Sequence, residues 1–382
     1  MRPCAEKTEV NASSEAAYGG CEAGAREGGG KTVAHKATAQ DVADLAGVSR
    51  SAVSLVLNGR AQGHIARDKQ QAIIEAARRL NYTPNAVALS LRSQRTRTIG
   101  VLTWPGKSGF SVPMLHAALE KATAEGYLLI FMDTANDRDH QSRALATLHD
   151  HQVDALLVIA PDLVEYRPAD VMSTIPTILV NCVDPTRRLT SIVADEYAAG
   201  AAAARVLIKA GHRRIGVVAG SLEALDSRLR LQGVEATAAA GHADLLVQKV
   251  ANRDITCGFE ATSALLLGPG APTGLICLHE RLAAGAALAA ANLRVAVPND
   301  LSLVSLEDGE QLASQLVPRL TTIERPDRAI AEKAVMLTLQ RCEDDGDQSA
   351  EQLTFGCSAM ARQSVIGPGP QNRRPCRPAD KR

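Results

Sequence analysis

From residue 99 onwards, runs of apolar residues alternate with amphipathic stretches, and this alternation constrains the fold more than any other feature of the chain. Continuous apolar strands separated by helices are typical of parallel sheets that helices cover on both faces. We therefore predict an α/β domain at 99–366, built as two lobes that each hold a doubly wound parallel sheet. The predicted strands are 99–103, 128–132, 155–159, 177–181, 215–219, 245–248, 274–278 and 301–305. The predicted helices between them are 114–125, 198–210, 227–240, 258–267 and 280–292.

The segment before this domain has a compact helical pattern. Thr38 begins a variant of the capping box, and the residues after it place apolar side chains on one helical face. Gly47 interrupts this helix, and Ser49, two residues later, can cap a second helix at 50–57. A third helix is predicted at 67–80. Two short helices joined by a glycine-containing turn are typical of a helix-turn-helix. We therefore predict an all-α helix-turn-helix domain at 37–83.

The charge of the chain is unevenly distributed. The whole sequence has 42 basic and 42 acidic residues, so its formal net charge is zero. Between Lys36 and Thr98, however, ten basic residues stand against four acidic ones, which leaves this segment with a charge of +6. A small basic module attached to a more acidic remainder is the electrostatic pattern of a nucleic-acid-binding head. A solvated basic surface without a partner is the alternative that charge alone leaves open.

Composition excludes several other classes of protein. Hydrophobic residues make up 46% of the chain, enough for an ordinary core. No window approaches the ~18 unbroken apolar residues of a membrane helix, and the N-terminus lacks the apolar segment of a secretory signal. We therefore expect a cytoplasmic protein that makes no membrane contact. Residues 1–36 and 367–382 are rich in small, polar or Pro and Arg residues, and we predict that both are disordered tails.

The chain carries no recognisable catalytic or metal-binding motif. Its eight cysteines are scattered without a Cys-x-x-Cys pair, so neither a disulfide framework nor a zinc site is predicted. It lacks the Gly-x-Ser-x-Gly, His-Glu-x-x-His and Gly-x-Gly-x-x-Gly patterns of common enzyme classes. We predict a protein without catalytic activity, metal or cofactor. The alternative is a solute-binding or enzymatic α/β protein whose basic head is incidental.

Several short motifs of the chain stand out beyond the predicted helices and strands. They are the segments 38–49, 53–59, 80–88, 211–215, 297–298, 301–304 and 320–323, with Arg362 and Ser364. Through these motifs the chain resembles the lactose-repressor (LacI/GalR) family of bacterial transcription regulators, most specifically in the predicted helix-turn-helix and the residues that follow it. The resemblance covers about residues 38 to 366 and implies a DNA-binding head, a hinge helix, and a two-lobed effector domain like a periplasmic sugar-binding protein.

The resemblance implies which residues contact DNA. Arg50 and Ser51 would face base edges in the major groove, where a bidentate arginine–guanine pair contributes about 1–3 kcal/mol of discrimination. A contact to phosphate alone is the alternative for Arg50. Leu55 stands where the family usually has an arginine, so it either meets a thymine methyl group or packs. The full predicted set is Thr38, Ser49, Arg50, Ser51, Ser54, Leu55, Asn58, Asn85 and Leu91, of which Thr38, Ser49, Asn58 and Asn85 would anchor the DNA backbone.

The hinge helix and its linker are predicted at 84–98. Leu91 falls where the family inserts a leucine into the minor groove, which unstacks a base step and bends the duplex. Packing against the partner's hinge helix alone is the alternative. The octet 85–92 is shorter than the ~12–15 residues at which an isolated helix becomes marginally stable. We therefore predict that it becomes helical only when two copies pair on DNA.

The effector-binding residues are expected in the cleft between the lobes, where the carboxyl ends of the strands meet. Arg228 matches the family's ligand-binding arginine region, with Arg230 as a structural neighbour. Arg253 replaces a common aromatic residue, so the pocket is expected to be more charged than the family's, and its arginines favour an anionic effector. The predicted set is Phe110, Asn181, Arg228, Arg253, His279, Glu280 and Glu307. Each of these residues is alternatively a charge or polar group on a lobe surface.

Taken together, these features predict a homodimeric regulator, most simply a repressor, that binds a pseudo-palindromic operator in double-stranded DNA. Each protomer would supply one recognition helix, so the symmetry of the operator follows from the two-fold axis of the protein. A small molecule, sugar or sugar derivative, would control operator binding. The protein would act in the bacterial cytoplasm, associated with the nucleoid. The sequence leaves open whether the effector induces or co-represses.

Overall fold

The computed structural model describes residues 37–59, 61–83, 90, 95–105, 112–309, 311–343 and 349–369. The chain divides into two compact units, Met1–Asn85 and Ala86–Arg382. The predicted hinge helix lies almost wholly outside the described residues, as do the site residues Asn85, Leu91 and Phe110.

The first unit contains the predicted helix-turn-helix. Its described helices are α1 (Ala39–Ala46), α2 (Arg50–Leu57) and α3 (Arg67–Arg79). The capping box forms as predicted, because the Asp41 amide donates to Thr38 Oγ1 (3.3 Å) and the Thr38 amide donates to Asp41 Oδ2 (2.7 Å). Gly47 ends α1 with φ at 64°, a left-handed conformation that glycine adopts without strain. The three helices enclose a small core of Val42, Ala43, Val53, Ile73, Ala76 and Ala77.

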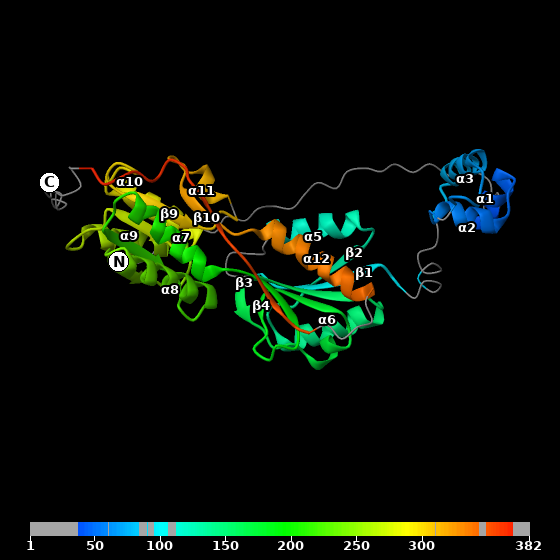
Figure 1. Ribbon diagram of the computed structural model, residues 1–382, viewed down its shortest axis with the longest axis horizontal. Helices are drawn as coiled ribbons and strands as arrows, with labels where there is room; N and C mark the ends of the chain where they lie inside the picture. The colour runs from blue at the N-terminus through cyan, green and yellow to red at the C-terminus, as the bar shows by residue number, and fades with distance from the viewer. Residues whose placement is uncertain are drawn as a thin grey trace, which may run out of the picture. The chain divides into compact units, whose positions relative to one another are not determined.

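The second unit has two lobes, and lobe 1 is built on a parallel sheet. Its described strands are β1 (Thr98–Thr103), β2 (Leu128–Asp133), β3 (Ala155–Glu165), β4 (Thr177–Val183), β5 (Thr190–Ala194) and β11 (Gln352–Phe355), in the order β11-β5-β4-β3-β1-β2. Helices α5 (Val112–Ala124) and α12 (Asp327–Glu343) pack on one face. Helix α6 (Arg138–Asp150) packs on the other, near the short 3₁₀ turn η1 (Asp170–Ser173). Figure 1 shows α5 and α12 side by side over this sheet.

Lobe 2 has the same architecture as lobe 1, except that one edge strand of its sheet is antiparallel. Its described strands are β6 (Arg214–Ala219), β7 (Asp244–Lys249), β8 (Gly274–Cys277), β9 (Ser302–Leu306), β10 (Thr321–Glu324) and β12 (Ser358–Met360), in the order β12-β10-β9-β8-β6-β7. Strand β12 pairs antiparallel with β10, and the other pairings are parallel. The described helices are α7 (Glu196–Lys209), α8 (Leu225–Ala240), α9 (Ile255–Leu267), α10 (Glu280–Asn292) and the short α11 (Leu312–Gln315). The predicted fold of two doubly wound α/β lobes is confirmed.

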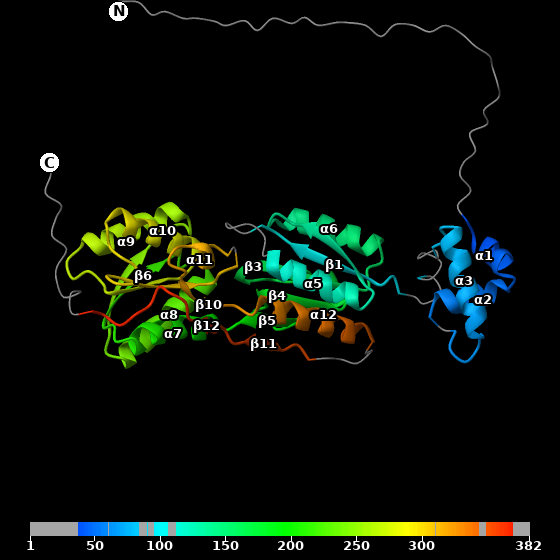
Figure 2. The ribbon, with the colours of Figure 1, turned by 90° about the horizontal axis from the view of Figure 1, so that it is seen from above.

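The chain passes between the lobes at several points along the described residues. It crosses from β5 to α7, returns from β10 to α12, and crosses again from β11 to β12. Figure 2 shows these connections running between the two sheets. Each lobe is therefore assembled from segments far apart in the sequence, and the carboxyl ends of the β3, β8 and β9 strands are brought to the junction.

Glycines set the spacing of α7 and α8, the two helices that supply the charged side chains of the junction. A Cβ atom at Gly200 would lie 1.9 Å from the carbonyl oxygen of Arg230. A Cβ atom at Gly233 would lie 2.0 Å from the carbonyl oxygen of Tyr197. Since real side chains never approach so closely, only glycine at these positions permits the two helices to pack backbone against backbone.

Candidate functional site

The head exposes one face of α2 while it buries the other. Val53 is buried in the core, whereas Ser49, Arg50 and Ser51 at the start of the helix are exposed. Ser49 caps the helix, because its Oγ accepts a hydrogen bond from the Ala52 amide (3.2 Å). Within the described residues, Arg50 makes no hydrogen bond or ion pair that would commit its guanidinium group. The start of α2 therefore presents a free arginine and helix N–H groups to solvent, an arrangement that suits DNA.

The other predicted DNA-contacting residues of α2 lie further along the same helix. Ser54, Leu55 and Asn58 are half-buried, and Asn58 Nδ2 donates to Ser54 Oγ (3.2 Å). Thr38 lies at the start of α1, where its hydroxyl group is engaged with Asp41 (2.8 Å). The structure thus brings together the residues from Ser49 to Asn58, and places Thr38 on the neighbouring helix.

A second feature is a set of buried and half-buried charged residues at the carboxyl ends of the strands, which we call the interlobe network. In open α/β sheets this edge is where ligands bind. Asp162 comes from β3 in lobe 1, and α7 and α8 of lobe 2 supply a glutamate and an aspartate–arginine pair. The remaining members follow β7, β9 and β10 or begin α12. The network consists of Asp162, Glu196, Asp226, Arg230, Arg253, Glu307, Arg325 and Asp327.

Arg230 lies at the centre of this network and is completely buried. Its Nε donates to Glu196 Oε2 (2.6 Å), its Nη1 donates to the carbonyl oxygen of Leu278 (2.8 Å), and its Nη2 donates to Glu307. Burial opposes its charge, but Glu196 and Glu307 outweigh burial and raise the pKa of Arg230 well above its ordinary value. Its guanidinium group is thus fully used by the protein itself.

Arg253 connects the two lobes. Its Nη1 donates to Asp162 Oδ1 of lobe 1 (2.9 Å), and its Nη2 donates to both carboxylate oxygens of Asp226 in lobe 2 (2.5 and 2.7 Å). The Ser227 hydroxyl lies 3.2 Å from the same nitrogen. One guanidinium group is therefore shared by carboxylates that belong to different lobes.

Glu307 links the network to His279 and Arg325. It follows β9 with φ at 69°, a left-handed conformation that is uncommon for a residue with a side chain. Burial opposes its charge, but Arg230 and Arg325 outweigh burial and hold the pKa of this carboxyl well below its usual range. Arg325 lies 3.5 Å from Glu307 Oε1 and donates to Asp327 Oδ1 (2.6 Å).

His279 is buried in its neutral form. Its Nδ1 accepts a hydrogen bond from the Arg281 amide (3.3 Å) at the start of α10, and its Nε2 lies 3.4 Å from Glu307 Oε2. This geometry requires the proton on Nε2, because Nδ1 already accepts. Burial lowers the pKa of His279 to about 4, although Glu307 acts in the opposite direction.

The remaining effector-site predictions are distributed differently. Glu280 is buried at the start of α10, where Oε2 accepts from the Leu312 amide (3.4 Å). Asn181 is buried at the end of β4 and donates to the carbonyl oxygen of Ala160 (3.2 Å), while its Oδ1 has no partner among the described residues. Arg228 is exposed on α8, outside the interlobe network.

The anion-binding role expected for the arginines is not supported by this geometry. Arg230 and Arg253 are already paired with carboxylates, and Arg228 does not enter the network. Sequence interpretation missed the carboxylates that neutralise them. The position of two of these carboxylates in the sequence could have indicated them, because Asp162 and Asp226 come after the carboxyl ends of the predicted strands 155–159 and 215–219. The missed members are Asp162, Glu196, Asp226, Arg325 and Asp327.

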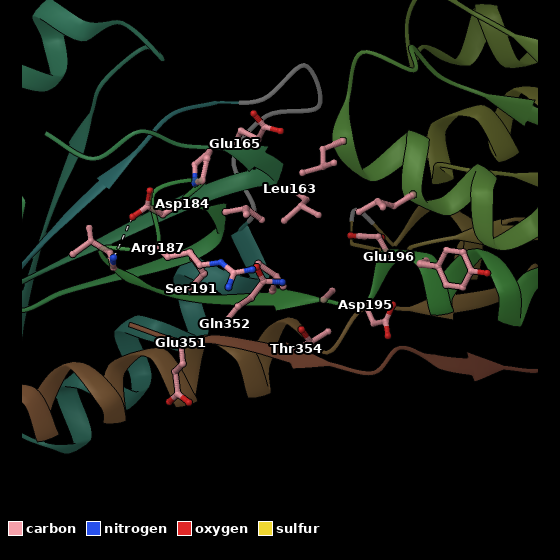
Figure 3. A pocket seen from close by; sticks show the side chains of 18 of the residues that line it. Leu163, Glu165, Asp184, Arg187, Ser191, Asp195, Glu196, Glu351, Gln352 and Thr354 are labelled. Atoms are coloured by element: carbon pink, nitrogen blue, oxygen red, sulfur yellow. Dashed lines mark hydrogen bonds between the residues drawn. The ribbon is translucent and has the colours of Figure 1, made fainter. Parts of the chain in front are cut away.

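Two grooves adjoin the network. A groove of about 530 Å³ is lined by Glu307, Arg325 and Asp327 and by residues at the start of α12, so it opens the network to solvent. A larger groove of about 910 Å³ runs along β5 and β11 to the starts of α7 and α8. Figure 3 shows Asp195 and Glu196 at one end of this larger groove. Among the described residues, no cluster of His, Cys, Asp or Glu has the arrangement of a metal site. The same residues include no helix long and apolar enough to span a membrane.

The head and the lobes together define a class of protein: a helix-turn-helix module followed in the chain by a two-lobed α/β domain. Residues 38–85 match the model of bacterial regulatory proteins, lacI family, and residues 204–365 match that of a periplasmic binding protein-like domain. The HTH-type transcriptional repressor PurR of Haemophilus influenzae (strain PittEE) is 30% identical over 336 residues, which cover 86% of this chain and 98% of that protein. The chain belongs to the lacI family of bacterial regulatory proteins.

Other relatives agree with this assignment. The ribose operon repressor of Haemophilus influenzae (strain ATCC 51907 / DSM 11121 / KW20 / Rd) is 29% identical over 331 residues, with coverage of 86% of this chain and 98% of that protein. The Lac repressor dimer bound to operator and the anti-inducer ONPF shares the fold, with a TM-score of 0.70, 24% identity, and coverage of 87% of this chain and 99% of that chain. A complex of the transcriptional regulator CelR with cellobiose has a TM-score of 0.60 at 21% identity, and covers 86% of this chain and 100% of that chain. The chain is therefore a transcription regulator and not an enzyme.

Proposed function

We propose that this protein is a repressor that binds a pseudo-palindromic DNA operator as a homodimer in the bacterial cytoplasm, associated with the nucleoid. The observation that carries the proposal is the free guanidinium group of Arg50 at the exposed start of α2. This helix lies in the head that matches the lacI family, within the segment from Lys36 to Thr98 that has a charge of +6. Arg50 and Ser51 read base edges, while Thr38, Ser49, Asn58 and Asn85 hold the DNA backbone. Ser54 and Leu55 complete the contact along the helix.

Selection from a random DNA pool tests this function. The full-length protein is expected to enrich a two-fold symmetric sequence, and a gel shift at physiological salt is expected to show preference for it over scrambled DNA. If no sequence is enriched and the protein shifts all DNA equally, the function as a repressor is wrong. That outcome would favour a solute-binding or enzymatic α/β protein with an incidental basic head.

The proposed homodimer is supported by apolar side chains that remain exposed on lobe 1 and lobe 2. Val112 and Leu119 on α5 are exposed, as are Leu288 on α10 and Val317 after α11. A second copy would cover such residues, since the Lac repressor structure with the same fold is a dimer. Sedimentation velocity tests this, because Leu288→Glu is expected to shift a dimeric protein to monomers.

Leu91 is proposed to enter the minor groove at the operator centre, and Asn85 to flank it. The support is the position of Leu91 in a hinge segment too short to be a stable isolated helix. Leu91→Ala is expected to reduce operator bending in circular-permutation gel mobility, and to flatten the response of DNA binding to effector. Equal bending by both proteins would show that Leu91 is not the wedge.

The effector is proposed to be a small molecule, sugar or sugar derivative, that binds at the interlobe network and alters lobe closure. Arg253 and Glu307 belong to this network, and His279 lies against Glu307. Glu280, Phe110, Asn181 and Arg228 are the flanking candidates. The relatives whose names mention ribose or cellobiose support a sugar-like ligand. Thermal-shift screening identifies it, because a ligand that binds the folded state raises its melting temperature.

A further inference from the structure

The Arg253 side chain lies between the two lobes, where a bound ligand would be expected. Arg253 lies in the loop between β7 and α9, not in a helix or strand, and reaches across the junction to Asp162 of lobe 1. Its guanidinium group is held by four oxygen atoms, one from Asp162, two from Asp226 and one from Ser227. Planar guanidinium groups pair with carboxylates in this multidentate way when they are recognised as ligands.

The carboxylates that hold Arg253 need a cation. Asp226 is completely buried, and its only other arginine contact among the described residues is Arg230 at 3.9 Å. Burial raises the pKa of Asp162, and the nearby Arg253 acts in the opposite direction, so the guanidinium group favours the charged carboxylate. The described members of the network comprise five carboxylates and three arginines, and the neutral His279 adds no positive charge.

The site also has a route by which a ligand reaches it. The Asp162 side chain retains 28% of its exposure, unlike the other carboxylates that hold the arginines. It lies where the pairing of β3 with β4 shifts register between Ile159 and Val164. The strand is irregular at this point, so the carboxylate can separate from Arg253 without breaking a regular ladder.

We propose that Arg253 is a built-in ligand that holds the two lobes closed when no effector is present, and that the effector carries an ammonium or guanidinium group that replaces it between Asp162 and Asp226. The proposal rests on the proposed function for the existence of an effector, but the latch itself does not. A small molecule that lacks a cationic group would leave the buried Asp226 and the half-buried Asp162 without the cation that joins them. An amino sugar fits this chemistry, and a sugar phosphate does not.

Chemical rescue of the full-length protein tests the latch. Arg253→Ala is expected to open the lobes, measured as an increased radius of gyration in small-angle X-ray scattering, and to lower the melting temperature. Methylguanidinium chloride is expected to bind the variant saturably in isothermal titration, to restore closure, and to raise its melting temperature by about 3 °C at ten times its Kd. Methylurea, which is neutral and of the same shape, is expected to do neither.

Matched variants make the result unambiguous. Arg205→Ala removes an exposed arginine on α7 of the same lobe and is expected to leave closure unchanged. Asp162→Asn removes the ion pair between Arg253 and lobe 1 but leaves the contacts of Arg253 within lobe 2 intact. This variant can therefore test the latch if Arg253→Ala does not fold. It is expected to open the lobes by itself and, in the double variant, to weaken methylguanidinium binding at least tenfold.

Several results would overturn the proposal. It fails if Arg253→Ala and Asp162→Asn keep the scattering profile of the parent, or if methylurea rescues as well as methylguanidinium. Stabilisation of the parent protein by inorganic phosphate at concentrations where methylguanidinium does not stabilise the variant would assign the site to anions instead. Operator selection with the same preparations is a separate readout, so a protein that binds no operator can still show the latch.

Discussion

Arg230 on α8 donates through Nε to Glu196 on α7 over 2.6 Å, and both side chains are completely buried. The same guanidinium group donates through Nη2 to the carboxylate of Glu307. Both charges of this ion pair have been removed from water. Loss of one partner would therefore leave the other charge buried without compensation, which lowers the stability of the fold. These ion pairs tie β9 and two helices of lobe 2 into one rigid support for the junction.

Removing the central cation should therefore be severe. Arg230→Met leaves Glu196 and Glu307 buried with reduced compensation, and we expect the free energy of unfolding to fall by about 3–5 kcal/mol. Urea denaturation measures this. The control is Arg228→Met, two positions away but exposed, which should change stability by no more than about 0.5 kcal/mol. Equal losses in both variants would contradict the central role of Arg230.

Because α7 and α8 pack backbone against backbone, we predict that one added methyl group at Gly233 destabilises the protein. In Gly233→Ala the new Cβ would lie 2.0 Å from the Tyr197 carbonyl oxygen, so the helices must separate. We expect a loss of about 1–3 kcal/mol or more. Gly356→Ala is the matched control, because a Cβ at Gly356 meets no atom within 4 Å. Thermal unfolding of the two variants compares them, and similar melting temperatures would show that the helices can yield.

The buried neutral His279 predicts a dependence of stability on pH. Its pKa in the folded protein is about 4, below the ordinary 6.5, so between these values the unfolded chain binds more protons than the folded one. The contribution is therefore present above pH 6.5 and is lost as the pH falls towards 4. Its full size is about 3 kcal/mol.

The measurement compares the parent with His279→Asn, which keeps an acceptor for the Arg281 amide but does not titrate. Urea midpoints between pH 7.5 and 4.5 should fall more steeply for the parent than for the variant. Other groups titrate equally in both proteins, so the difference isolates His279. Parallel curves would mean that the pKa of His279 is the same in the folded and the unfolded protein.

Base readout by the head predicts that Arg50→Ala weakens binding to the selected operator by about 1–3 kcal/mol and binding to random DNA by less. Arg79→Ala removes an equal charge from an exposed position at the end of α3. It should weaken both kinds of DNA alike or not at all. Fluorescence anisotropy at one fixed salt concentration gives the four affinities. Should Arg50→Ala lower both affinities equally, Arg50 contacts phosphate only.

Much of the fold was predictable because its strands are long and apolar. All the predicted strands and helices of the α/β domain are present, with ends that differ by a few residues. The helices α6 and α12 and the strands β5, β10, β11 and β12 were not among the predicted elements. Three of these strands have weak local signals. Strand β5 is wholly buried yet begins with Thr190 and Ser191, and β11 and β12 are short and largely exposed. Their pairing depends on neighbours distant in the chain, which periodicity does not report.

The site was predictable in its location but not in its pairings. Strand ends indicated where charged residues would meet, and Arg253, His279 and Glu307 do lie there. The partner of Arg253 in lobe 1, Asp162, is 91 residues away in the sequence, so no local pattern predicts this pair. Arg228 and Arg230 are two positions apart on one helix and face different directions, and the packing of α7 against α8 selects Arg230 as the buried one.

The crossings between the lobes have a consequence for how the chain is made. Lobe 1 takes α12 and β11 from the part of the chain that follows nearly all of lobe 2. Chains fold from the N-terminus as they leave the ribosome, so the sheet of lobe 1 waits for residues synthesised some 150 positions later. Until then the apolar face that Ile330, Ala334 and Val335 cover stays open to water. A chain that ends before residue 327 therefore leaves both lobes unfinished, because lobe 1 lacks α12 and β11 and lobe 2 lacks β12.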